Sequence, residues 1–203
     1  MNLMQYDAMA LGPYELSLGP VVLRERIQEA AFPILSANVL DRSSGELVAE
    51  PYVILKVGDH RVAVIGLTRL PKEALDKFEV LDPEQVLTQV VAELEGPADV
   101  VILLTNLPFR LAQELARGLP GIDLLVAALP EQFPDRAVRL SNPGTLAVSA
   151  EQPVPRHTGR WIGKLVAVLA SDGTLGNESW TSVPMGPEIA DDPQMAILLN
   201  KYQ

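Results

Sequence analysis

The stretch that decides the fold runs from Asp99 to Leu129 and reads DVVILLTNLPFRLAQELARGLPGIDLLVAAL. Its first part, Asp99–Thr105, is almost entirely apolar after the aspartate and predicts a buried strand. Phe109–Leu119 then places leucines four residues apart, as an amphipathic helix does, and Ile122–Leu129 is a second apolar run. A strand, a helix and another strand in this order place the chain in the α/β class.

The segments upstream repeat this alternation of strand and helix. Tyr52–Val57 and Arg61–Leu67 flank the turn Gly58-Asp59-His60 and predict a β-hairpin. Asp82 directly precedes Pro83, a pattern typical of a helix start, because aspartate caps and proline suits the first helical position. The other expected elements are a strand over Asp7–Gly12, a helix over Leu16–Ala31 and a strand over Pro33–Leu40.

Beyond Leu129 the helical periodicity stops and the chain becomes mostly strand. Short apolar runs separated by proline, glycine, asparagine and aspartate predict strands over Ala137–Leu140, Leu146–Ala150, Gly163–Ala170 and Glu178–Pro184. A short terminal helix is expected over Asp191–Tyr202. We therefore divide the chain into a layered α/β domain over residues 1–185 and a C-terminal tail or linker helix over residues 186–203, with a mixed sheet or a sandwich as the architecture.

Composition limits the partners and the chemistry. The 203 residues include 26 acidic and 16 basic ones, so the formal net charge is −10. An acidic surface repels phosphate backbones and anionic lipids, and we expect neither nucleic acid nor a membrane as a partner. Without cysteine there are no disulfides, thiolate metal sites or cysteine nucleophiles. The two histidines, His60 and His157, lie in expected turns and are interpreted as solvated; the first residues do not resemble a signal peptide.

The opening twenty residues, MNLMQYDAMALGPYELSLGP, resemble the stretch of the 5'-nucleotidase / UDP-sugar hydrolase family that carries its G-N-H-E/D metal motif. These enzymes are calcineurin-like metallophosphoesterases. Further segments resemble the same family in the same order, namely Phe32–Val39, Pro51–Thr68, Ala98–Leu107, Gly121–Ala128 and Gly159–Leu165. The resemblance implies a four-layer α/β/β/α sandwich with mixed sheets, whose first strands are missing because the family's D-x-H and G-D motifs lie upstream of this chain.

The family's chemistry, as the resemblance implies it, uses two divalent metal ions that hold a phosphate and activate a water. Its G-N-H-E/D motif corresponds to Gly12-Pro13-Tyr14-Glu15, in which Pro13 offers no ligand atom and Tyr14 replaces an imidazole. Its S-H motif corresponds to Thr105-Asn106. Its G-H-S/T-H motif corresponds to Ala128-Leu129-Pro130-Glu131, where Glu131 is the one polar side chain. Four imidazoles and one asparagine of the family pattern are therefore replaced.

We interpret the chain as a degenerate 5'-nucleotidase-like domain without metal catalysis, in a binding or assembly role, and expect no cofactor. The alternative is a metal-dependent nucleotide or sugar-phosphate hydrolase whose missing ligands come from an upstream segment or another chain. It would use Mn²⁺, Zn²⁺, Mg²⁺ or Ca²⁺. The remaining oxygen-bearing residues that could gather around one hard cation are Glu15, Asn106 and Glu131.

Two kinds of partner follow from this interpretation. A nucleotide or sugar phosphate would meet Arg110, Tyr14 and Phe109 near the former motif loops; the alternative is that Phe109 packs and Arg110 is solvated. Missing strands would leave the edge near Asp7–Gly12 open, so we expect self-association or another polypeptide that completes the sheet. A fragment of a longer protein is the competing explanation. The compartment stays unknown, although the family is typically periplasmic or extracellular.

Overall fold

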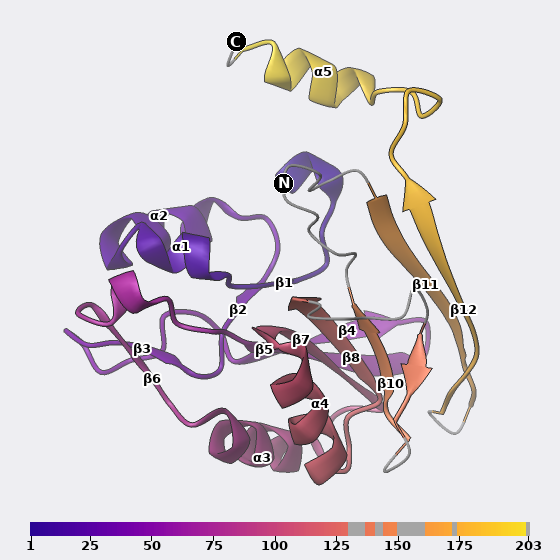
Figure 1. Ribbon diagram of the computed structural model, residues 1–203, viewed down its shortest axis with the longest axis horizontal. Coiled ribbons are helices and arrows are strands. Elements are labelled where there is room, and N and C mark those ends of the chain that lie inside the picture. Colours follow the sequence, from indigo (N-terminus) through magenta and orange to yellow (C-terminus); the bar gives the residue numbers. More distant parts are fainter. Residues whose placement is uncertain (130–136, 141–143, 150–160, 172–173, 202–203) are drawn as a thin grey trace.

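The computed structural model describes residues 1–129, 137–140, 144–149, 161–171 and 174–201. Its centre is a six-stranded sheet in the order β4-β5-β7-β8-β10-β9 (Figure 1). The four inner strands β5, β7, β8 and β10 run parallel, and the outer strands β4 and β9 are antiparallel to their neighbours. The bounds are β4 Tyr52–Val57, β5 His60–Leu67, β7 Val100–Pro108, β8 Leu124–Leu129, β9 Val138–Arg139 and β10 Leu146–Ser149.

The predicted β-hairpin is confirmed. Val57 of β4 pairs with His60 of β5, which leaves Gly58 and Asp59 as a two-residue turn, and Gly58 takes a φ of 61°. At the start of β5, Arg61 donates from its backbone and its guanidinium to Asp99, just before β7. The Arg61 side chain is the main cause that lowers the pKa of Asp99 to about 2.

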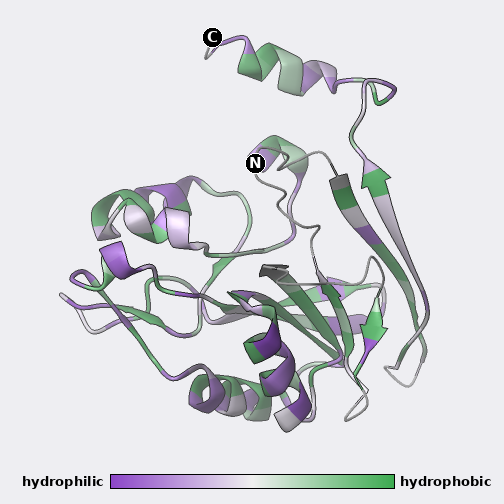
Figure 2. Ribbon diagram, viewed as in Figure 1, coloured by the Kyte–Doolittle hydropathy of each residue, from purple (hydrophilic) through white to green (hydrophobic). Residues whose placement is uncertain are grey.

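Two helices, α3 Pro83–Leu94 and α4 Phe109–Gly118, connect the parallel strands and cover one face of the sheet (Figure 1). The predicted start of α3 is confirmed, because the Asp82 carboxylate accepts from the backbone N–H groups of Glu84 and Gln85 at 3.0 and 2.9 Å. Figure 2 shows the sheet strands as mainly hydrophobic. The helices bury against them Leu87, Val90, Val91, Leu94, Ala112, Leu115 and Ala116.

The opposite face carries the N-terminal part of the chain. Strands β1 Met9–Ala10 and β2 Ile34–Leu35 form a parallel pair, and both contact β5. They are joined by α1 Pro13–Ser17 and α2 Pro20–Glu29, and followed by the antiparallel pair β3 Val39–Asp41 and β6 Phe78–Val80. Two short 3₁₀ helices, Asn2–Met4 and Lys72–Ala74, complete this layer.

Two of the expected elements are wrong in their extent. The single helix over Leu16–Ala31 is two helices, because Gly19 takes a φ of 83° and Pro20 starts a new helix after it. The single strand over Pro33–Leu40 is also divided, into β2 and β3. Between them, Ser36 and Ala37 donate to the backbone of Glu50 and Gly66, which bends the chain away from a continuous ladder.

The C-terminal part begins with two strands, which the sequence predicts, and they pair as an antiparallel hairpin. The hairpin consists of β11 Trp161–Leu169 and β12 Leu175–Pro184, and the short helix α5 Pro193–Leu199 follows. The α/β class with several sheets is therefore confirmed, and the division at residue 185 stays a prediction. Among the described residues, no helix combines the length and the hydrophobicity that a membrane span requires.

Gly66 of β5 lets the β1–β2 layer approach the sheet. A Cβ atom at this position would lie 2.5 Å from the Leu35 carbonyl oxygen, a backbone atom that cannot swing aside. We therefore expect Gly66→Ala to lower the free energy of unfolding by about 1–3 kcal/mol, as overpacking does, in urea denaturation.

The matched control is Gly118→Ala, at the end of α4, where an added Cβ meets nothing within 4 Å. It should leave stability unchanged or slightly raised, because alanine suits a helix better than glycine. Equal urea midpoints for the two variants would contradict the close crossing of β2 over β5.

Candidate functional site

Asn106 stands at the carboxyl end of β7, in an irregular step of the ladder. The pairs Thr105–Ala127 and Pro108–Leu129 show that β7 has one more residue here than β8. Bulges of this kind re-aim side chains, and the Leu107 N–H is satisfied by the Thr105 hydroxyl at 3.0 Å. The Asn106 side chain consequently lies in the interior, where the residue is 8% exposed.

Both ends of the Asn106 amide are occupied by backbone groups. Its Nδ2 donates to the Leu11 carbonyl oxygen at 2.7 Å, and its Oδ1 accepts from the Arg69 N–H at 2.6 Å. Leu11 directly follows β1, and Arg69 lies two residues after β5. A single side chain thus connects the carboxyl ends of three strands.

A second buried pair reinforces this connection. The Asn38 amide makes two hydrogen bonds with the backbone of Thr68, at 2.8 and 2.9 Å, and both residues are fully buried. The Thr68 hydroxyl in turn donates to the Leu11 carbonyl oxygen at 3.2 Å. The side chains of Asn38, Thr68 and Asn106 are therefore all hydrogen-bonded to backbone groups, whereas the buried Ser36 hydroxyl after β2 has no hydrogen-bond partner among the described residues.

The motif loop Gly12-Pro13-Tyr14-Glu15 forms the start of α1. Gly12 is the N-cap, Pro13 is the first helical residue, and a Glu15 carboxylate oxygen accepts from the Gly12 N–H at 3.0 Å. Glu15 therefore acts as the acidic partner of a capping box. Tyr14 is 84% exposed and is therefore not part of the buried network.

The remaining predicted site residues are distributed as follows. Phe109, at the start of α4, is 7% exposed and belongs to the core of the sheet, whereas Arg110 beside it is exposed. Leu129 ends β8, but its side chain, like all of Glu131, lies outside the described residues. The structure thus brings Glu15 and Asn106 to the same edge, next to Gly12, and leaves the roles of Arg110, Tyr14 and Phe109 as predictions.

These donor atoms do not fit a pair of divalent metal ions. Such a site needs several carboxylate or imidazole ligands for each ion. Here the Asn106 oxygen is held by a backbone N–H, Glu15 caps a helix, and Pro13 has no ligand atom. Within the described ranges, no three side chains of His, Cys, Asp or Glu come together in a way that could hold a metal ion.

A groove of about 550 Å³ opens beside Glu15. Its lining is dominated by apolar side chains of the N-terminal segment, β1, β2 and α2. The cation on its wall, Arg26, already pairs with Glu29 at 2.7 Å. This groove suits an apolar occupant better than a phosphate. Its apolar lining comprises Met1, Leu3, Met9, Leu11, Leu18, Leu23, Ala30, Phe32, Ile34 and Leu198.

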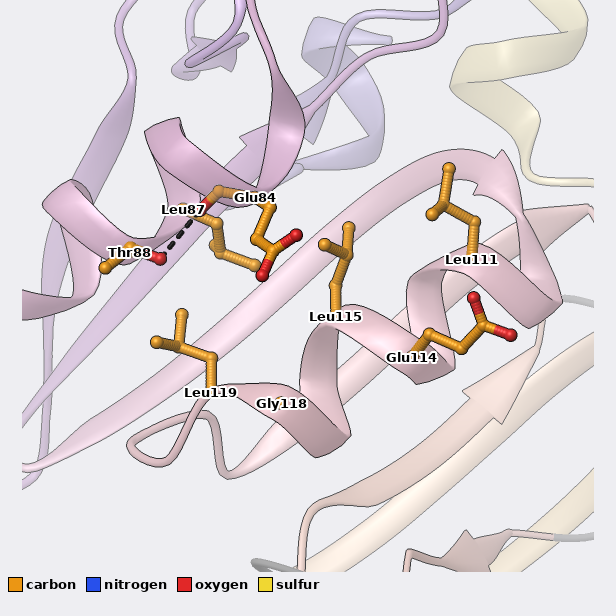
Figure 3. A pocket seen from close by; sticks show the side chains of 8 residues that line it. All are labelled: Glu84, Leu87, Thr88, Leu111, Glu114, Leu115, Gly118 and Leu119. Atoms are coloured by element: carbon orange, nitrogen blue, oxygen red, sulfur yellow. Dashed lines mark hydrogen bonds between the residues drawn. The ribbon is translucent and has the colours of Figure 1, made fainter.

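A smaller groove of about 290 Å³ lies between α3 and α4, on the helix-covered face of the sheet (Figure 3). Leu87 and Leu115 form part of its floor, and Glu84 of α3 and Glu114 of α4 also line it. Two carboxylates repel an anionic ligand. This groove is therefore not a place where a nucleotide would bind.

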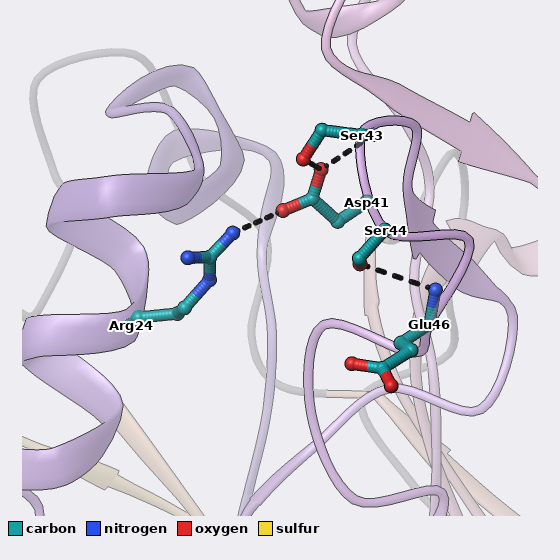
Figure 4. A network of polar contacts seen from close by, with 5 residues as sticks. All are labelled: Arg24, Asp41, Ser43, Ser44 and Glu46. Carbon is teal, nitrogen blue, oxygen red and sulfur yellow. Dashed lines mark hydrogen bonds and ion pairs between the residues drawn. The ribbon is translucent and has the colours of Figure 1, made fainter.

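A polar cluster around Asp41 has a structural role (Figure 4). One carboxylate oxygen accepts from the N–H and the hydroxyl of Ser43, at 2.9 and 2.7 Å, and the other pairs with Arg24 of α2. The Ser43 hydrogen bonds are the main cause that lowers the pKa of Asp41, and Arg24 adds to the effect. The cluster fixes the turn after β3 and ties it to α2.

Sequence reasoning missed Asn38, Thr68 and Asp41. Each is a buried polar residue within or next to an apolar run, at 0%, 0% and 4% exposure. A polar residue inside such a run is the signal that could have identified them, because burial of a polar group requires a partner. The partners themselves come from distant segments and were not visible in the sequence.

Comparison with known proteins gives a consistent result. The chain matches no protein-family model. Protein UshA of Salmonella pullorum is 30% identical to it over an alignment that covers the whole chain and 46% of UshA. The chain therefore spans about half the length of the curated relatives it matches.

Solved structures agree with this similarity. The 5'-nucleotidase precursor from Thermus thermophilus superposes with a TM-score of 0.79 at 27% identity, covering 98% of this chain and 43% of that one. The calcineurin-like phosphoesterase YfkN from Bacillus subtilis superposes with a TM-score of 0.72 at 21% identity. This superposition covers 100% of this chain and 70% of YfkN. The latter likeness concerns the fold alone.

The hydrogen bonds of Asn106 predict a stability effect. Asn106→Leu keeps the volume but leaves the Arg69 N–H without its acceptor, whereas the Leu11 carbonyl retains the Thr68 hydroxyl. We expect a loss of about 1–3 kcal/mol in the free energy of unfolding, measured by urea denaturation. Asn200→Leu, at an exposed position, is the control and should change it by less than about 0.5 kcal/mol. An unchanged midpoint for Asn106→Leu would argue against a stabilising role for the Asn106 hydrogen bonds.

The lowered pKa of Asp41 predicts a pH dependence. The folded protein holds the pKa of the Asp41 carboxyl below its ordinary value of 3.8. The stabilisation that this carboxylate contributes is therefore complete above that pH and is lost as pH falls through the folded pKa. Asp41→Asn should therefore be less stable than wild type near neutral pH, and the difference should shrink in acid. Urea denaturation of both proteins at several pH values tests this, with the exposed Asp76→Asn as control. A difference that stays constant down to strong acid would contradict it.

Proposed function

Because the chain is a homologue of the 5'-nucleotidases with the fold of the calcineurin-like phosphoesterases, we propose that it keeps this fold without metal catalysis and serves in binding or assembly. The proposal rests on one observation. At the edge of the sheet where the former motifs meet, the Asn106 amide is hydrogen-bonded to Leu11 and Arg69. The amide oxygen, the one atom of this side chain that could bind a metal, is thus directed at a backbone N–H.

The chemistry of the substituted residues supports the same proposal. A two-metal hydrolase stabilises charge and generates a metal-bound hydroxide, worth several kcal/mol of barrier. Pro13 cannot coordinate, exposed Tyr14 cannot replace a charged imidazole, and Glu15 caps α1. No step of phosphate ester hydrolysis can be assigned to these three residues.

The alternative function is hydrolysis of a nucleotide or sugar phosphate with Mn²⁺, Zn²⁺, Mg²⁺ or Ca²⁺. It would require ligands from an upstream segment or another chain. Binding of a nucleotide near Arg110 without hydrolysis is compatible with a binding role. The export that is typical of the family stays a prediction for this chain.

An assembly role has a structural basis at β1. Within the part of the chain that the structure describes, β1 has one strand neighbour, β2, and the apolar groove lies beside both strands. An unpaired strand edge next to apolar side chains favours pairing with another polypeptide. We propose that this edge, near Asp7–Gly12, accepts an additional strand.

Metal content tests the proposed function. The protein is dialysed against Mn²⁺, Zn²⁺, Mg²⁺ and Ca²⁺ in turn, desalted, and measured by inductively coupled plasma mass spectrometry, with a 5'-nucleotidase treated in parallel. We expect close to no metal per chain and no phosphate release from 5'-AMP or UDP-glucose. One or two ions per chain together with phosphate release would contradict the proposal and support the hydrolase.

A further inference from the structure

The hairpin β11–β12 exposes an apolar face. Alternate residues of β11 point to solvent, and Ile162, Val166 and Val168 are 53%, 49% and 53% exposed. Lys164 lies between them, and the cross-strand partners Val183, Thr181 and Ser179 are uncharged. Among the described residues, this face has no acidic side chain, although the chain as a whole has a net charge of −10.

The hairpin is also poorly supported on its own. Its two strands pair with no third strand among the described residues. The contacts that anchor it include an ion pair between Arg139 of β9 and Glu178 at 2.9 Å, and a hydrogen bond from Arg139 to the Leu175 carbonyl. A two-stranded ribbon is marginal in water unless a further strand or a helix packs against it. The exposed face is where such a helix would lie.

The helix α5, like the hairpin, has an apolar surface that is not buried. Its sequence, PQMAILL, is apolar over most of its surface (Figure 2), but none of its residues is buried. A helix that is hydrophobic all round is normally enclosed, and an isolated helix of seven residues is marginal. Leu198 lines the groove beside the N-terminal segment of its own chain. Ile197 remains 62% exposed.

We propose that α5 of one copy packs on the outer face of the β11–β12 hairpin of a second copy, and the reverse, in a two-fold symmetric dimer. Ile197 would contact Val166 and its apolar neighbours, as helices cover sheets in layered folds. Asp191 and Asp192 at the start of α5 complement Lys164, the single charge on the hairpin face. The reciprocal contact closes the assembly at two copies.

The second copy is the favoured occupant because of where α5 lies. The chain leaves β12 and carries α5 beyond the end of the hairpin rather than over its face (Figure 1). With Leu198 at its own groove, α5 presents Ile197 away from the body of its own chain. This contact does not depend on the proposed absence of metal catalysis.

The absence of cysteine makes disulfide trapping a clean test. Two single variants, V166C and I197C, are mixed and oxidised, and the products are resolved on a non-reducing gel. We expect a cross-linked species of twice 22.0 kDa from the mixture and little from either variant alone. Light scattering of the wild type should likewise give twice the chain mass, and Ile197→Asp should halve it.

Other outcomes identify other occupants and overturn the proposal. An intramolecular disulfide in the double variant V166C/I197C, without cross-linking of the mixture, would place α5 on its own hairpin. Cross-linking of V166C with itself would indicate two hairpins face to face. A wild type that is monomeric, together with no cross-linking in the mixture of V166C and I197C, would also overturn it. Val21→Asp, at another highly exposed apolar position on α2, is the control and should leave the mass doubled.

Discussion

The hydrogen-bonded amide of Asn106 is the constraint on which the rest of this site depends. It joins the end of β7 to Leu11 after β1 and to Arg69 after β5, in an interior where an unmet polar group is costly. The Asn38–Thr68 pair extends the same connection. A sheet edge that open α/β folds commonly use to bind ligands is here held together by its own side chains. The side chain at this former motif position therefore stabilises the scaffold.

Much of the fold could be predicted from local sequence signals. The alternation of apolar strands and amphipathic helices identified β5, α3, β7, α4 and β8, and Asp82-Pro83 marked a helix start correctly. The helix predicted over Leu16–Ala31 is divided, because Gly19 takes a φ of 83°, which ends the first helix, and Pro20 starts the second. The hydrogen bonds of Asn106 could not be predicted, since they depend on a one-residue bulge and on segments up to 95 positions away. Local patterns specify elements, whereas long-range contacts decide what a polar side chain does.

The two ends of the chain carry the apolar surface that the core does not use. Near the N-terminus, a groove runs beside β1 and β2; near the C-terminus, the hairpin face and α5 lie open. Gly66 and the Asp41 cluster show, by contrast, how closely the intervening segments fit. A closely packed centre with apolar margins is typical of a protein that acts through contacts with other polypeptides. The proposed assembly role would give these apolar margins a partner.

The most direct test of this account is a crystal structure determined from crystals grown with Mn²⁺, with an anomalous difference map calculated at the edge formed by Gly12, Glu15 and Asn106. The account predicts no anomalous peak there, and an Asn106 amide that still bonds to Leu11 and Arg69. A peak within coordination distance of Glu15 or Asn106, with the amide turned away from Arg69, would contradict it. That result would show that the hydrogen bonds yield to a metal ion and that the site retains its chemistry.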